Sequence, residues 1–120
     1  MSLRYFGTSH VGLRRKNNQD CICFLENKDH ALLAVVCDGI GGGLAGDVAS
    51  HIAIDHMKES FLKMTPCHND VEVKHWLQNT IQEANDQIFL QSTKNEEQKG
   101  MGTTMVGILK YDASTYIFNV

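Results

Sequence analysis

An apolar stretch that ends in an acid and several glycines is the segment best suited to chemistry. Residues 31–37 are apolar, Asp38 follows them, and glycines occupy positions 39, 41, 42 and 43. A run this continuous is typical of a strand buried on both faces, so Asp38 is expected at the end of such a strand. Glycines let main-chain carbonyls or amides approach an ion or a phosphate closely. The segment therefore predicts a metal or phosphate site built from main chain and one carboxylate.

Two common phosphate-binding motifs do not fit this segment. A P-loop needs a lysine followed by serine or threonine after its glycines, but residues 44–47 read Leu-Ala-Gly-Asp. The dinucleotide-binding fingerprint is also incomplete, because Leu44 stands where its last glycine belongs. Taken alone, the segment also fits a glycine-rich turn from a strand to a helix, with Asp38 as a capping residue.

A second cluster lies upstream, where basic residues precede amides and an acid in the order Arg14-Arg15-Lys16-Asn17-Asn18-Gln19-Asp20. Together the two segments resemble the first two motifs of the metal-dependent serine/threonine protein phosphatases of the PP2C (PPM) type. Further on, residues 100–104 (Gly-Met-Gly-Thr-Thr) resemble the third motif of this family, so that the resemblance covers nearly the whole chain. The other matching residues are Gly12, Arg15, Asn18, Gln19 and Asp20, then Val36, Asp38, Gly39, Gly41 and Gly42, and then Gly46, Ala49 and Ser50 in the opening of a helix.

The resemblance implies a role for several matched residues. Asp38 would bridge two divalent cations, and the carbonyl of Gly39 would ligate one of them. Asp20 would lie beside the same ions, as a ligand or through a bound water. Oxygen ligands of this kind suit Mn²⁺ or Mg²⁺ better than zinc. Arg15 would bind the substrate phosphate through two parallel hydrogen bonds, whereas without the motif it would be read as a solvated surface charge.

The reaction implied by the resemblance is the hydrolysis of phosphoserine or phosphothreonine on proteins by a hydroxide held between the two metal ions. The substrate would be a phosphorylated protein, and the enzyme would oppose a serine/threonine kinase. Many family members are thought to use a histidine near the aspartate-glycine pair as general acid, but Ile40 and Gly43 occupy the two usual positions. His51 is the nearest downstream histidine and is expected on the following helix.

Length conflicts with a complete catalytic domain of this family. Residues 1–120 amount to about half of such a domain and contain none of the later aspartates of its metal site. We therefore expect the N-terminal part of a single PP2C-like phosphatase domain, inactive or weakly active by itself. A catalytically dead PP2C-like module that binds a phosphoprotein or a regulator is the alternative. An unrelated small α+β interaction module is the third hypothesis.

Composition argues against nucleic-acid and membrane partners. The net charge is -3 and the only basic cluster is residues 14–16, which disfavours a nucleic-acid surface. No apolar run reaches the roughly 18 residues of a membrane span, and residues 1–5 lack the core of a signal peptide, so a cytoplasmic location is expected. A sheet without its second half would leave strand edges unpaired, which predicts self-association through them.

The cysteines are expected to be structural residues and to form no binding or catalytic site. Their spacing fits neither a disulfide framework nor a paired C-x-x-C zinc site, so all four are expected to be reduced thiols. Cys21 and Cys23 should share one face of a strand. A zinc site that combines cysteine with His30 or His68 is a weaker alternative, because the spacing is loose.

Periodicity predicts an α+β fold, part of an α-β-β-α sandwich in which two antiparallel helices cover an antiparallel sheet. Strands are expected near 3–11, 20–26 and 31–38, and a hairpin over 103–120 with its turn at 112–114. The first helix should run from 43 or 44 to 64, and the second should open at Asn69 with Glu72 as a capping-box variant. Residues 92–100 are expected to be a polar loop. The apolar stripes are Ala49, Ala53, Met57, Phe61 and Met64 in the first helix, and Val73, Leu77, Ile81, Ala84 and Ile88 in the second.

Overall fold

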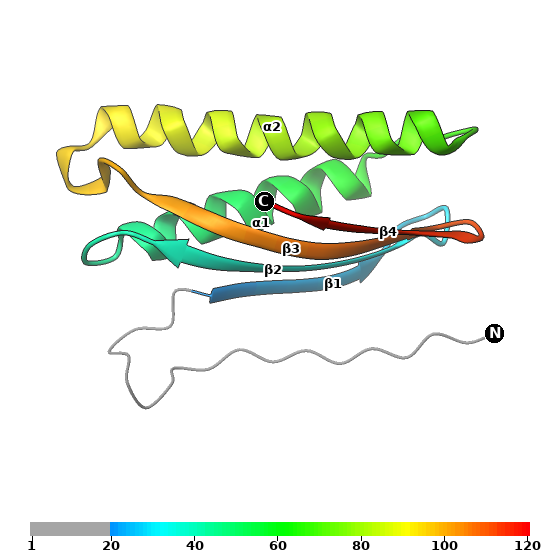
Figure 1. Cartoon of the computed structure of the whole chain (residues 1–120), viewed down its shortest axis with the longest axis horizontal. Coiled ribbons are helices and arrows are strands. Elements are labelled where there is room, and N and C mark those ends of the chain that lie inside the picture. The colour runs from blue at the N-terminus through cyan, green and yellow to red at the C-terminus, as the bar shows by residue number, and fades with distance from the viewer. Residues whose placement is uncertain (1–19) are drawn as a thin grey trace.

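The computed structural model describes residues 20–120, which form a sheet with two helices on one of its faces (Figure 1). The expected strand over 3–11 lies outside the described residues. In chain order the strands are β1 (Asp20–Glu26), β2 (Leu32–Ile40), β3 (Gly102–Tyr111) and β4 (Ser114–Asn119). The helices α1 (Ala45–Leu62) and α2 (Asp70–Lys94) connect β2 to β3, and the short 3-10 helix η1 (Glu96–Gln98) follows α2.

The sheet is antiparallel throughout, with the strand order β1-β2-β3-β4. The strands thus lie in the sheet in the same order as along the chain. Among the described residues, β1 and β4 form the two edges. Tyr111 pairs with Ser114 at the tip of the last hairpin, and Asp112 in the turn has a φ of 52°. The predicted hairpin is confirmed with a loop of two residues, Asp112 and Ala113.

Helix α1 lies against the sheet and α2 packs against α1, running in the opposite direction (Figure 1). The small side chains of Ala49 and Ala53 are completely buried, which lets α1 approach the strands closely. Met57 and Phe61 continue the same buried stripe, and Phe61 contacts the Trp76 ring of α2 at a centroid distance of 6.4 Å. The predicted stripe is thus confirmed, although α1 ends at Leu62, before Met64.

Helix α2 begins where the sequence predicts. The side chain of Asn69 caps it by accepting a hydrogen bond from the Glu72 amide at 2.9 Å. Glu72 reaches back one residue further than in a standard capping box, since its carboxylate accepts from the His68 amide at 2.7 Å. The buried residues of α2 are Val73, Leu77, Thr80, Ala84 and Ile88.

The polar loop expected over 92–100 is wrong in its first part, because α2 continues to Lys94 and η1 follows it. Ser92 and Thr93 are accommodated because their hydroxyls donate to the Phe89 and Leu90 carbonyls, at 2.7 and 2.8 Å. Such local bonds let hydroxyl side chains remain in a helix with their polar groups paired. Neither helix of the described residues is both long and apolar enough to span a bilayer.

The two faces of the sheet differ in coverage. Strand β2 alternates between buried residues such as Val35 and Cys37, both 0% exposed, and more accessible ones such as Val36, 43% exposed. The expectation of a strand buried on both faces is therefore wrong for the described residues. The cause is that α1 and α2 lie on the same side, so only every second side chain of β2 meets the helices. We call these sides the covered face and the open face.

Candidate metal centre

Two carboxylates predicted to be metal ligands are direct cross-strand neighbours. Asp20 begins β1 and Asp38 lies near the end of β2, and the register pairs them opposite each other. Both alternate with the buried Cys21 and Cys37, so both lie on the open face. Opposite residues in an antiparallel pair have Cβ atoms about 4.5–5.5 Å apart, close enough for two carboxylates to share a cation.

The third motif lies beside this pair. The register pairs Gly102 with Ile40, Thr103 with Gly39, and Thr104 with Asp38. The hydroxyl of Thr104 donates to the Asp38 carbonyl at 3.4 Å, which ties the start of β3 to the end of β2. Segments that are more than sixty residues apart in the sequence therefore meet at one end of the sheet (Figure 1).

Gly39 is required by packing. A Cβ added there would lie 1.8 Å from the carbonyl oxygen of Gly46, in the first turn of α1. The absence of a side chain thus lets the end of β2 touch the start of the helix that follows it. A ligand role for the Gly39 carbonyl stays a prediction, since this contact alone accounts for the glycine.

The donor set of the described residues fits a hard divalent cation in kind. Carboxylate oxygens from Asp20 and Asp38 are the ligands that Mg²⁺ and Mn²⁺ prefer. Residues 20–120 contain no cluster of three or more histidine, cysteine, aspartate or glutamate side chains that could hold a metal ion. Oxygen donors beyond these two carboxylates are therefore needed to complete an octahedral shell. The same finding removes the zinc site with His30 or His68.

A polar cluster on the covered face lies behind the carboxylates. The Cys21 sulfur is 3.3 Å from both the Ser50 hydroxyl oxygen and Nδ1 of His51. The same Nδ1 lies 2.8 Å from the Asp47 carbonyl, which can only accept, so Nδ1 carries the proton. The ring contacts the Cys21 sulfur, which lies on the covered face, so we do not assign His51 as a general acid for the carboxylate site. Sequence reasoning missed this cluster.

Burial raises the pKa of the two cysteines next to the carboxylates. Desolvation raises the pKa of Cys37 to about 12 and also raises the pKa of Cys21. The four cysteines carry free thiols, as expected, and Cys21 and Cys23 share the covered face. Sequence reasoning did not identify the cross-strand pair of Cys21 and Cys37. The signal was present, because in antiparallel strands the pairing of Asp20 with Asp38 entails that of the next residues inward.

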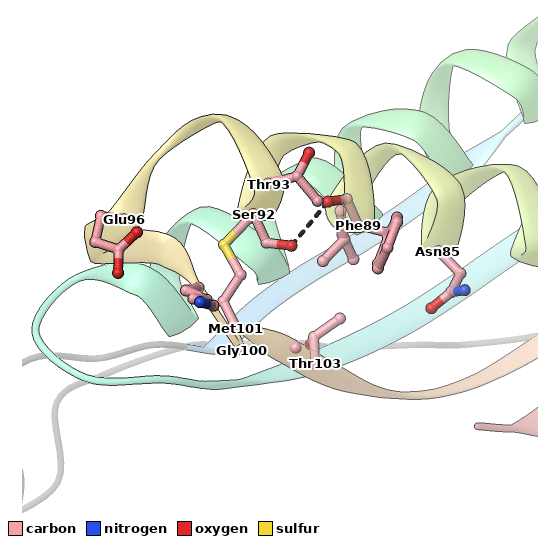
Figure 2. A pocket seen from close by; sticks show the side chains of 11 residues that line it. Asn85, Phe89, Ser92, Thr93, Glu96, Gly100, Met101 and Thr103 are labelled. Carbon is pink, nitrogen blue, oxygen red and sulfur yellow. Dashed lines mark hydrogen bonds between the residues drawn. The ribbon is translucent and has the colours of Figure 1, made fainter.

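A pocket of about 570 Å³ opens at the same end of the sheet, between the last turns of α2 and the start of β3 (Figure 2). Asn85, Phe89 and Ser92 line it from α2, and Met101 and Thr103 line it from the other side. The Ser92 hydroxyl is engaged by the Phe89 carbonyl. We assign this pocket no ligand, since its polar groups converge on no single point (Figure 2).

The sequence profile of a family described as protein phosphatase 2C matches residues 6–120. The chain belongs to this family. Among curated proteins it is 38% identical over 109 residues to the serine/threonine phosphatase stp of Listeria monocytogenes serotype 4b. That alignment covers 91% of this chain and 43% of the relative, so the chain spans less than half the length of this curated phosphatase.

The fold of this chain is similar to that of solved phosphatase structures. The serine/threonine phosphatase Stp1 from Staphylococcus aureus matches with a TM-score of 0.82 at 33% identity, covering all of this chain and 50% of that one. The catalytic domain of the phosphatase PstP, solved in complex with two manganese ions, matches with a TM-score of 0.81 at 27% identity. It covers 98% of this chain and 47% of that one. The α+β fold predicted from sequence is thus confirmed.

Arg15, the residue that the family resemblance assigns to the substrate phosphate, lies outside the described residues, as do Gly12, Asn18 and Gln19 of the same motif. Of the predicted protein phosphatase 2C site, the structure describes Asp20, Asp38 and Gly39, and it brings these three residues together. Among the described residues, no histidine lies on β1 or β2.

Proposed function

We propose that this chain is the N-terminal part of a single protein phosphatase 2C domain that hydrolyses phosphoserine and phosphothreonine on proteins. The observation that carries the proposal is the direct opposition of Asp20 and Asp38 on the open face, at the end of the sheet where the family motifs meet. Family membership supplies the reaction class. Because the chain spans less than half of its curated relative, by itself it is expected to be inactive or weakly active.

Two divalent cations, Mn²⁺ or Mg²⁺, are proposed to bind at the carboxylate pair. Asp38 would contact both cations, while Asp20 and the Gly39 carbonyl would complete part of the shell. Support comes from the oxygen chemistry of the pair and from the manganese ions named for PstP. When bound, such ions activate water and offset the charge of a phosphoryl group. The β1–β2 register would fix the positions of the two residues whose carboxylates hold the ions.

Arg15 is proposed to bind the phosphate of the substrate. Its guanidinium can donate two parallel hydrogen bonds to phosphoryl oxygens, which orients the phosphorus toward the attacking water. The family motif places Arg15 five positions before Asp20, so the phosphate would lie close to the carboxylate pair. Replacing Arg15 should therefore raise KM for a phosphorylated substrate.

Protonation of the leaving group is proposed to come from solvent at the site. Ile40 and Gly43 occupy the family's histidine positions, and His51 is held on the covered side by Cys21 and Asp47. An aryl phosphate needs less help from an acid than phosphoserine does, because its leaving group is more acidic. We expect the ratio of aryl phosphate to phosphoserine turnover to be high.

A catalytically dead module that binds a phosphoprotein is the second candidate. The specific observation in its favour is that residues 20–120 offer no cluster of three metal-binding side chains. Arg15 could still hold a phosphate without any cation. This candidate predicts binding of a phosphoserine peptide without turnover.

The partners that follow are a phosphorylated protein substrate and an opposing serine/threonine kinase. A cytoplasmic location is proposed as well, supported by four free thiols, which are typical of a reducing compartment.

Self-association is proposed through the edges β1 and β4, assisted by the open face. Accessible apolar side chains on that face include Val106, Ile108 and Ile117, at 54%, 46% and 79% exposed. Apolar surface of this kind favours association.

The experiment that tests the proposed function compares manganese-dependent hydrolysis of an aryl phosphate and a phosphoserine peptide by this chain and by a longer chain that continues past Val120. Asp38→Ala should reduce kcat/KM by about 100-fold or more, because the transition state loses a cation-holding carboxylate. Asp55→Asn on α1 is the matched control and should leave turnover unchanged.

Turnover in either chain that vanishes in Asp38→Ala supports the phosphatase. Turnover confined to the longer chain also supports the reading of a part of a domain. No metal-dependent turnover in either chain, together with binding of the phosphoserine peptide, would overturn the proposal in favour of the dead module.

A further inference from the structure

Two thiols on the covered face lie opposite each other across β1 and β2. The register pairs Cys21 with Cys37, one position inward from the carboxylate pair. Opposite residues of antiparallel strands have Cα atoms about 4.5–5.5 Å apart. A disulfide requires a Cα separation of about 4.4–6.8 Å. The backbone already meets this requirement, so a bond between the two sulfurs needs no change of register.

The same geometry selects this pair among the four cysteines. Cys23 is on the covered face too, but it pairs with Val35 and is only diagonal to Cys37. Diagonal neighbours are about 7–8 Å apart, beyond the Cβ separation of about 3.5–4.5 Å in a disulfide. Cys67 lies after α1, outside the paired strands, with its amide bonded to the Tyr111 hydroxyl.

Cys21 is the less deeply buried member of the pair. It lies on β1, which is an edge strand among residues 20–120, is 9% exposed, and contacts the Ser50 hydroxyl and the His51 ring. The His51 side chain, whose Nδ1 is 3.3 Å from this sulfur, is 59% exposed. Cys37 is completely buried. An oxidant would therefore meet Cys21 first, and Cys37 would react only with the modified sulfur of Cys21.

We propose that Cys21 and Cys37 form a redox-active pair that closes to a disulfide in response to a hydroperoxide. In the first step the Cys21 sulfur bonds to one peroxide oxygen and the oxygen–oxygen bond breaks. The thiol proton leaves with the other oxygen as an alcohol or water, and Cys21 becomes a sulfenic acid. In the second step the Cys37 sulfur bonds to the Cys21 sulfur, and the sulfenic oxygen leaves as water with the Cys37 proton. The two thiols are oxidised by two electrons and one peroxide is reduced.

Closure of this disulfide acts on the carboxylate pair, a consequence that rests on the proposed metal site. Opposite Cβ atoms about 4.5–5.5 Å apart move to about 3.8 Å when a disulfide joins them. The strands are then drawn together on the covered face, and the side chains of Asp20 and Asp38 spread apart on the open face. We expect the affinity for Mn²⁺ to fall about tenfold, as for other changes in groups that support metal ligands.

The test treats the reduced 120-residue chain with excess hydrogen peroxide, because burial keeps both thiols protonated and the reaction slow. Intact mass should fall by two hydrogen atoms, and a peptide map should join Cys21 to Cys37. Cys23→Ser and Cys67→Ser are the matched controls and should still form this bond, whereas Cys21→Ser should not. Circular dichroism of each variant checks that it is folded.

A bond between any other two cysteines, or oxidation of Cys67 alone, would overturn the proposal. A second measurement titrates Mn²⁺ into the reduced, the oxidised and the re-reduced chain by calorimetry. Weaker binding that recovers with reductant supports the coupling, and equal binding in all three overturns it. Absence of binding in the reduced chain would refute the proposed metal site while the mass measurement still decides the disulfide.

Discussion

The covered and open faces of the sheet differ in burial and in the kind of residue that they carry. On the covered face, residues such as Val35, Leu109 and Phe61 of α1 are completely buried and form one apolar core. On the open face, the alternate residues of the same strands are half-exposed or exposed, and two acids lie opposite each other at one end. Adjacent residues in one strand thus belong either to the apolar core or to the accessible face that carries the acids.

A strand can place a charged site directly next to a core. A side chain moves to the other face with each step along a strand, so Asp38 can be accessible while Cys37 and Gly39 are buried against α1. Rigid packing on one side then fixes the backbone that carries the acids on the other. Substitutions on the covered face should act on stability, and those on the open face should act on binding and association.

The largest expected effect on stability comes from removing a covered aromatic ring. Phe61→Ala should lower the free energy of unfolding by about 3–5 kcal/mol, because a completely buried ring leaves a cavity. Ile117→Ala on the open face, where the side chain is 79% exposed, should change it by less than about 0.5 kcal/mol. Chemical denaturation of both variants measures the difference, and equal losses would contradict the division between the faces.

A smaller loss is expected where β2 meets α1. Gly39→Ala should cost about 1–3 kcal/mol, because its Cβ would collide with the Gly46 backbone, which cannot rotate away. Gly42→Ala is the control: nothing lies within 4 Å of its added Cβ, so the free energy of unfolding should change by less than about 1 kcal/mol. If both alanines are tolerated equally in thermal unfolding, the contact between strand and helix is not what selects glycine.

The start of α2 offers a test of similar design with a smaller effect. Asn69→Ala should cost about 1 kcal/mol, because the helix loses the bond from its cap to the Glu72 amide. Asn79 lies in the same helix, is exposed, and contacts the His75 ring through its amide. Asn79→Ala should therefore change stability by less than about 0.5 kcal/mol. Urea denaturation distinguishes the two, and a loss confined to Asn79→Ala would refute the capping role.

The open face should affect association more than folding. Replacing Ile108 and Ile117 together by threonine should weaken self-association in sedimentation equilibrium, since both side chains are accessible and apolar. The free energy of unfolding should change by less than about 1 kcal/mol. Unaltered association would place the interface at the edge strands alone.

The sequence predicts the covered side well. Apolar positions at helical spacing identify the buried stripes of α1 and α2, since packing on a sheet requires that spacing. The end of α2 was missed because Ser92 and Thr93 look like loop residues, although their hydroxyls bond to the helix itself. The open face was missed because an apolar run in β2 does not reveal which of its faces a helix covers.

The candidate site was predictable in part. The motifs place Asp20 and Asp38 in a functional context, and the register of β1 and β2 brings them together. The packing role of Gly39 was not found, because it depends on the start of α1, which only the fold brings beside this residue. The cross-strand pair of Cys21 and Cys37 was not found either, although the pairing of Asp20 with Asp38 entails it. Arg15 stays a prediction.

The cation site on the open face is tested most directly by titrating Mn²⁺ into the reduced chain and into the variants Asp38→Asn and Asp55→Asn, with binding followed by electron paramagnetic resonance. We expect saturable binding that Asp38→Asn abolishes or weakens by about tenfold or more, because one of two opposed carboxylates is lost. Asp55→Asn, which changes an exposed acid of α1, should bind as the unaltered chain does. No saturable binding, or equal binding in all three proteins, would contradict the assignment of a cation site to the open face.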